Sequence, residues 1–126
     1  MTGAQPRGRR WPRDRRITRG SEIRALFRRG TRSRMPHLDV FDSEAPASRS
    51  RVGLVVPRYG HTAVRRNQVK RRLREAIRTE LLPRLDSEGR SRDILVRARR
   101  EAYDLSYARL SRELESWVRR RWRDSS

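Results

Sequence analysis

Apolar residues along this chain recur at two spacings, and each spacing predicts one kind of element. In three short stretches every second residue is apolar, which is the pattern of a strand with one buried face. In the first of them, Leu38 and Val40 lie on one side, and Asp39 and Phe41 lie on the other. A further strand is predicted around residues 31–34. The three alternating stretches are HLDVF (37–41), RVGLVVP (51–57) and RDILVRAR (92–99).

Three other segments carry apolar residues three and four apart, the spacing of an amphipathic helix. The first helix is predicted to begin at the N-cap Ser21 and to stop at Gly30, a common terminator. The second follows the loop RYGHT and is predicted to end at Pro83, because proline interrupts helical hydrogen bonding. The last is predicted to start near Ser106 and to run through Val118.

The order of these elements, α-β-β-β-α-β-α, predicts a small α/β (α+β) two-layer sandwich. A chain of 126 residues has room for one such domain and one modest core. We assign the domain to residues 16–120, with residues 121–126 as a C-terminal tail. Residues 1–15 are basic, rich in Gly and Pro and without apolar periodicity, so we interpret them as a flexible N-terminal arm.

The second helix carries two neighbouring faces of opposite character. On a helical wheel, one arc is apolar and the arc beside it is basic. An ordinary surface helix mixes charges, and here only Glu75 and Glu80 could pair with the basic side chains. This arrangement favours phosphate binding over a solvated face. The apolar arc is Val69, Leu73, Ala76, Ile77 and Leu81, and the basic arc is Asn67, Lys70, Arg71, Arg74 and Arg78.

Composition points the same way. Lys plus Arg total 34 against 15 Asp plus Glu, a formal net charge of +19, and such a balance is tolerated mainly beside a polyanion. Only Lys70 is a lysine, so 33 of the 34 are arginine, a bias that base composition of the genome also explains. The chain has no cysteine and no apolar run long enough to span a membrane. We therefore expect a cytoplasmic protein, without a signal peptide, that binds nucleic acid and no membrane.

The order of residues in RRNQVKRRLRE resembles the arginine-rich signature of the protein subunit of bacterial ribonuclease P. The five residues that match are Arg66, Asn67, Lys70, Arg71 and Arg74. Gln68 replaces an arginine of that signature, His61 stands where the family usually has glycine, and Ile23 replaces the first of two phenylalanines. The similarity spans about residues 17 to 118 without a long insertion.

This resemblance implies an RNA-binding role in removing the 5′ leader from precursor tRNA. In that family the RNA subunit carries the active site and its Mg²⁺, so no catalytic or metal-binding residue is expected in this chain. The arginine-rich helix faces the catalytic RNA, through Arg65, Arg66, Asn67, Lys70, Arg71 and Arg74. The implied fold is similar to the second domain of ribosomal protein S5, with an uncommon left-handed β-α-β crossover.

The resemblance also implies a cleft for the single-stranded leader between the first helix and the sheet. Basic grooves with aromatic platforms hold single strands, because every base has a stacking face and every linkage a charge. The candidate residues here are Ile23, Phe27, Arg29, Phe41 and Arg58. A phenylalanine at such a position is equally well explained as part of the core, and both interpretations of Phe27 and Phe41 stay open.

Other classes of function are less well supported by the residues. His37 and His61 have no second ligand at metal-binding spacing, and Asp39 and Asp42 face opposite ways on a strand, so a two-metal nuclease site would need Asp93 or a glutamate. A structural RNA-binding protein of the ribosomal type fits the composition equally well. A DNA-binding module does not fit, because the element order contains no helix-turn-helix, and we expect no DNA partner.

Overall fold

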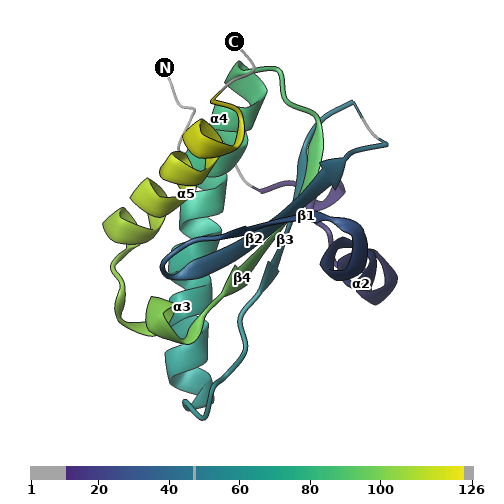
Figure 1. The fold of residues 1–126 in the computed structure, drawn as a ribbon. Helices are drawn as coiled ribbons and strands as arrows, with labels where there is room; N and C mark the ends of the chain where they lie inside the picture. Colours follow the sequence, from purple (N-terminus) through teal and green to yellow (C-terminus); the bar gives the residue numbers. More distant parts are fainter. Residues whose placement is uncertain (1–10, 47, 124–126) are drawn as a thin grey trace.

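The computed structural model describes residues 11–46 and 48–123, and these form a four-stranded sheet with helices on both of its faces (Figure 1). The predicted class and order of elements are confirmed. The strands are β1 (Thr31–Arg34), β2 (Leu38–Glu44), β3 (Arg51–Val55) and β4 (Arg92–Ala98). The helices are α2 (Gly20–Arg29), α3 (Ala63–Ala76), α4 (Leu82–Ser87) and α5 (Tyr107–Arg121), with a π-helical turn at Ile77–Leu81 and 3-10 turns at Arg13–Arg15 and Arg100–Asp104.

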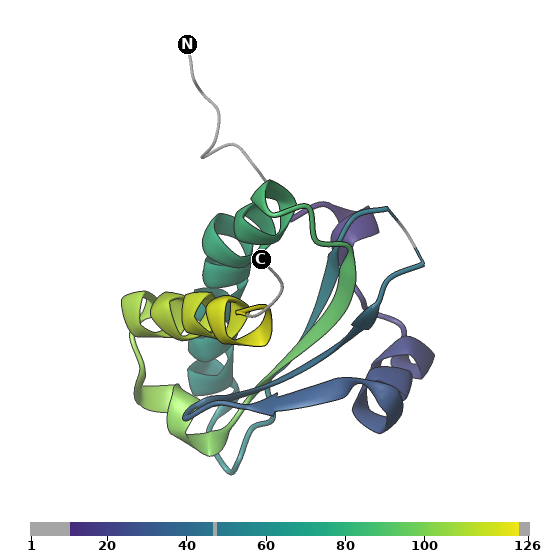
Figure 2. The same cartoon turned by 45° about the horizontal axis from the view of Figure 1, so that its top comes forward.

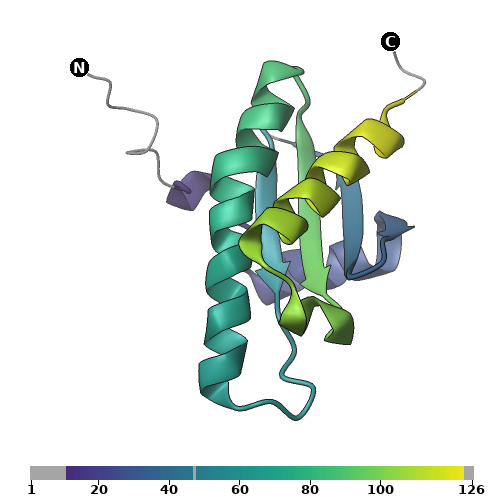
Figure 3. The ribbon, with the colours of Figure 1, turned by 90° about the vertical axis from the view of Figure 1, so that its left-hand side faces the viewer.

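The sheet is mixed, with strand order β1-β2-β4-β3. β2 is antiparallel to β1 and β4, whereas β3 and β4 are parallel and are joined through α3. In Figure 3, with α3 in front of the sheet, β3 runs downward, α3 returns upward, and β4 runs downward to the right of β3. The crossover is therefore left-handed, against the usual right-handed rule.

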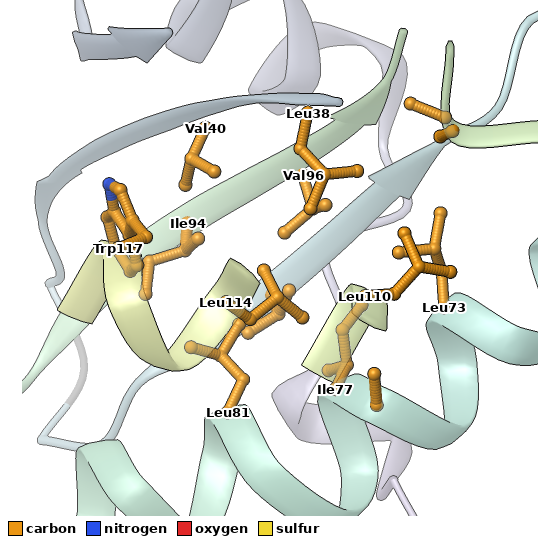
Figure 4. Close-up of a cluster of buried hydrophobic side chains, with 14 of the residues drawn as sticks. Leu38, Val40, Leu73, Ile77, Leu81, Ile94, Val96, Leu110, Leu114 and Trp117 are labelled. Atoms are coloured by element: carbon orange, nitrogen blue, oxygen red, sulfur yellow. The ribbon is translucent and has the colours of Figure 1, made fainter. Parts of the chain in front are cut away.

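The two faces of the sheet are covered unequally. Helices α3 and α5 lie together on one face, and α2 lies alone on the other, as a short additional layer (Figure 2). The main core is on the α3 and α5 side, where Leu38 and Val40 point, as their alternation predicts. Figure 4 shows how side chains from the sheet and both helices meet there, among them Leu73, Ile77, Leu81, Ile94, Val96, Leu110, Leu114 and Trp117.

The prediction that the second helix ends at Pro83 is wrong. The π turn at Ile77–Leu81 follows α3 directly, and α4 continues to Ser87 with Pro83 in its first turn. Proline is tolerated in the first turn of a helix, where its missing N–H has no partner to lose. The π turn shifts the register of the backbone hydrogen bonds just before Pro83. As a result, α4 starts as a new helix while the chain continues in the direction of α3.

The predicted domain boundaries are also wrong at both ends. The indole of Trp11 is buried and donates to the Arg15 carbonyl at 2.8 Å, so part of the predicted flexible arm belongs to the fold. Arg15 is buried as well, and its guanidinium binds both oxygens of Asp86 at 2.8 and 2.6 Å. At the other end, Trp122 packs against the core beyond residue 120. The remainder of the predicted arm, residues 1–10, lies outside the described residues, as do residues 124–126 of the predicted tail.

The Arg15–Asp86 pair makes a testable contribution to stability. Its hydrogen bonds hold the pKa of the Asp86 carboxyl below the usual range, against the opposing effect of burial. A carboxyl with a lowered folded-state pKa stabilises the fold above its unfolded-state pKa, and this stabilisation is lost as pH falls through the folded-state pKa.

We therefore expect Asp86→Asn to melt at a lower temperature than the parent at pH 7, with the difference shrinking once the pH falls below about 4, the usual pKa of an aspartate. Thermal melts across pH check this. The matched control is Asp14→Asn, an exposed acid in the same segment. A melting difference that stays constant from pH 7 to pH 3 would contradict the assignment.

Candidate nucleic-acid interface

A tight turn places the start of the basic helix. In the loop after β3, Tyr59 and Gly60 both have positive φ, 51° and 84°, a conformation that glycine adopts without strain. Thr62 then caps α3, with its side-chain oxygen accepting from the Arg65 amide at 3.2 Å. His61 stacks on the Tyr103 ring at 4.1 Å between centroids. The predicted loop is confirmed, and its turn fixes the direction in which α3 leaves the sheet.

The apolar arc predicted for α3 is buried. Val69, Leu73, Ala76, Ile77 and Leu81 all lie in the main core and are at most 1% exposed. The helix therefore presents its other side outward, because its rotation is fixed by that contact.

The basic arc lies on the outward side. Asn67, Arg71 and Arg74 are exposed and Lys70 is half-buried. Within the described part of the chain, Lys70, Arg71 and Arg74 form no salt bridge, so their charges are not neutralised by the protein. Cations in one row along a helix, with no acidic partner in the protein, can each attract one of the successive phosphates of a nucleic-acid backbone.

The remaining basic side chains of this helix are held by the protein. The Arg65 guanidinium pairs with Asp104 at 3.2 Å, and Arg66 donates to the Val56 carbonyl at 2.7 Å. Arg78 pairs with Glu75 at 2.9 Å, and this pairing lowers the pKa of the Glu75 carboxyl. The row of unneutralised charge therefore extends from Lys70 to Arg74, and Arg78 marks its end.

A cavity of about 320 Å³ adjoins this row. Its lining combines apolar side chains with three cations, Arg16, Lys70 and Arg74. Thus the N-terminal segment, α2 and α3 meet beside the basic face. The other lining residues are Trp11, Ile17, Thr18, Ile23, Val52 and Leu54.

The two phenylalanines predicted for a leader cleft lie in contact between α2 and the sheet. Their ring centroids are 4.9 Å apart, with the rings nearly perpendicular. Phe27 and Ile23 are half-buried, whereas Phe41 is only 6% exposed. Of the two interpretations left open for Phe41, the structure supports the core position, because α2 covers the ring together with Leu95. Of the two rings, only Phe27 has appreciable exposed surface.

The cations near these rings are not the predicted ones. The Arg97 guanidinium lies 5.6 Å from the centre of the Phe27 ring, and that of Arg32 lies 5.8 Å from Phe41. Arg29 and Arg58 are exposed, and Arg58 donates to the His61 carbonyl within its own loop. Arg32 is not predicted from the sequence, because its place beside Phe41 depends on the register of β1 and β2, in which the two residues lie directly opposite each other.

The carboxylates that could support catalysis are paired with basic side chains. Asp42 is fully buried and binds Arg92 at 2.5 Å and Arg121 at 2.9 Å. Asp39 pairs with Arg32, Asp93 with Arg51, and Glu113 with His37. In the described residues no group of three or more His, Cys, Asp or Glu side chains could hold a metal ion.

In that part of the chain, no helix has the length and apolar character needed to cross a membrane.

The fold and the basic face define a small basic α/β protein of the nucleic-acid-binding class. The family model for ribonuclease P matches residues 11–121, and the chain therefore belongs to the family of ribonuclease P protein components, the RNA-binding subunits of that enzyme. The matched span begins at Trp11, the first of the described residues.

Relatives and solved structures agree with this assignment. The chain is 38% identical over 104 residues to the ribonuclease P protein component of Mycolicibacterium gilvum, covering 80% of this chain and 81% of that one. It is 39% identical over 113 residues to the component from Desulfovibrio desulfuricans, covering 86% and 84%. The fold is similar to the Staphylococcus aureus RNase P protein, with a TM-score of 0.70, 22% identity and coverage of 85% and 94%. It is also similar to the Thermotoga maritima RNase P protein, with a TM-score of 0.67, 23% identity and coverage of 83% and 96%.

Proposed function

We propose that this chain is the non-catalytic protein subunit of a ribonuclease P that removes the 5′ leader from precursor tRNA in the cytoplasm. The active site and its Mg²⁺ belong to the RNA subunit and its substrate. The pairing of Asp39, Asp42 and Asp93 with arginines supports this division, because a carboxylate already held by a guanidinium is a poor metal ligand or base.

The single observation that carries the proposal is the unneutralised basic row on α3. Its three cations, Lys70, Arg71 and Arg74, project from a helix whose opposite side is locked into the core. A polyanion is the partner that relieves their mutual repulsion. This row faces the RNA subunit, with Asn67 and the held side chains of Arg65 and Arg66 at its start.

The leader of the substrate occupies the α2 face of the sheet. Phe27 offers the accessible ring edge there, Ile23 adds apolar contact, and Arg97 supplies charge beside them. Phe41 supports Phe27 from beneath without contacting RNA. Arg29 lies at the end of α2 and Arg58 in the loop before α3, and both act through charge alone.

The experiment that tests this function is reconstitution of the purified chain with the cognate RNA subunit and precursor tRNA. We expect no cleavage by the protein alone. We also expect the protein to lower the Mg²⁺ concentration at which the RNA subunit cleaves, because its cations neutralise part of the phosphate charge that Mg²⁺ otherwise neutralises. Cleavage rates at a series of Mg²⁺ concentrations check both points. Nuclease activity that survives stringent removal of RNA would overturn the proposed division of labour, and co-purification with ribosomal particles alone would favour a ribosomal role.

A further inference from the structure

A second basic cavity lies between β1 and the end of α5, lined by none of the α3 residues. Its volume is about 280 Å³, and it is lined by Ser33, Arg34, Met35, Trp117, Arg120 and Arg121. Since a water molecule occupies roughly 30 Å³ of liquid, the space admits a phosphate group with some of its hydration. The polar side-chain groups of the lining are hydroxyl, guanidinium and indole, and none is a carboxylate.

A buried donor in this lining has no partner. The side chain of Trp117 is 1% exposed, and within the described residues its indole nitrogen forms no hydrogen bond. Figure 4 shows this nitrogen at the end of the ring away from Leu114, Leu110 and Leu81. An unpaired N–H removed from water costs free energy, so a small shift of the ring that brings this nitrogen to an acceptor in the cavity would be favourable. The indole can only donate, so the missing partner is an acceptor.

The charges around the cavity favour an anionic acceptor. Arg34 is exposed and forms no salt bridge within the described chain. Arg120 is positioned by its contact with the Met35 sulfur at 3.5 Å. Arg121 is oriented by the buried Asp42, which it shares with Arg92, so this group of three keeps a net positive charge. Three guanidinium groups therefore line the cavity, and the one carboxylate beside them, Asp42, is already shared between Arg121 and Arg92.

We propose that this cavity is a second RNA-contact site that binds one backbone phosphate. Arg34 and Arg120 supply charge-assisted hydrogen bonds, and the Trp117 indole and the Ser33 hydroxyl complete the set of donors. Because the site is separate from the α3 row, the holoenzyme holds RNA on two faces of the protein. The inference does not depend on α3 binding the RNA subunit.

The first test uses nuclear magnetic resonance on the whole chain. The Trp117 indole N–H resonance, assigned by Trp117→Phe, is followed during titration with inorganic phosphate. We expect a saturable shift. Loss of one charge-assisted hydrogen bond should weaken phosphate binding roughly tenfold in Arg34→Gln and in Arg120→Gln. The matched control is Arg112→Gln, which removes one charge from an exposed position on α5 and should leave binding unchanged.

The second test distinguishes the source of the phosphate. The salt dependence of binding is measured for the RNA subunit and for precursor tRNA, with parent, Arg34→Gln and Arg112→Gln chains. The log–log slope should fall by about 0.7–0.9 in Arg34→Gln for the RNA that supplies the phosphate, and for that RNA alone. A Trp117 resonance that does not respond to phosphate, or responds equally in all variants, overturns the site. Unchanged slopes for both RNAs overturn its assignment to RNA.

Discussion

Charge reversal at Arg71 and Arg74 together is expected to weaken assembly with the RNA subunit roughly 100-fold or more, because two charge-assisted contacts become repulsive. The log–log salt slope should fall by about 0.7–0.9 for each phosphate that the helix no longer binds. The fold should survive, since both side chains are exposed and the apolar side of α3 is untouched. Filter binding at several salt concentrations, together with a thermal melt, measures all three quantities.

The matched control for this variant is charge reversal at Arg109 and Arg112, two exposed arginines of α5. It changes the net charge of the protein by the same amount without touching the α3 row. If both double variants lose affinity equally, only net charge matters and the row on α3 has no special role.

Phe41→Ala is expected to lower the free energy of unfolding by about 3–5 kcal/mol, the usual cost of removing a buried phenylalanine. The ring is 6% exposed and packs with Phe27, Leu95 and Leu26 in the cluster beneath α2. Losses in RNA binding should be equal for leader-bearing precursor tRNA and for mature tRNA, because the ring does not reach the leader. Denaturant unfolding and parallel binding measurements check the two statements.

Phe27→Ala provides the comparison, because its ring is only half-buried. Stacking on an aromatic ring contributes about 1–3 kcal/mol per base, so this variant should lose affinity for precursor tRNA while keeping affinity for mature tRNA. Ile23→Phe, one turn earlier on α2, should strengthen leader binding. If Phe41→Ala discriminates between the two RNAs and Phe27→Ala does not, the roles assigned to the two rings are reversed.

The sequence predicts the parts of this fold that depend on local periodicity. The buried side of α3 and the side of β2 that carries Leu38 and Val40 follow from spacing alone, because an element with one side in the core repeats its apolar residues at its own period. The basic face of α3 is predicted by the same helical-wheel positions. The candidate site on that helix is therefore visible in the sequence itself.

The features that spacing misses depend on packing between distant segments. Nothing near Phe41 in sequence indicates that α2 covers it, and nothing near Arg15 indicates a partner 71 residues away at Asp86. The helix through Pro83 is missed because a π turn is set by packing around it and not by residue type. The cavity beside Trp117 is missed for a related reason, since it joins β1 to the last turns of α5.

The strand order has a consequence for how this chain folds while it is being synthesised. The β1–β2 hairpin can pair as soon as Glu44 has left the ribosome, but β3 forms its ladder only with β4, which follows the whole of α3 and α4. Until β4 emerges, the apolar side of α3 has an incomplete sheet to pack against, and its cations are close to ribosomal RNA, the nearest polyanion. We therefore expect the time needed to translate the chain from the end of α3 through β4 and α5 to set how long this basic helix remains undocked, because the core against which it packs includes both elements.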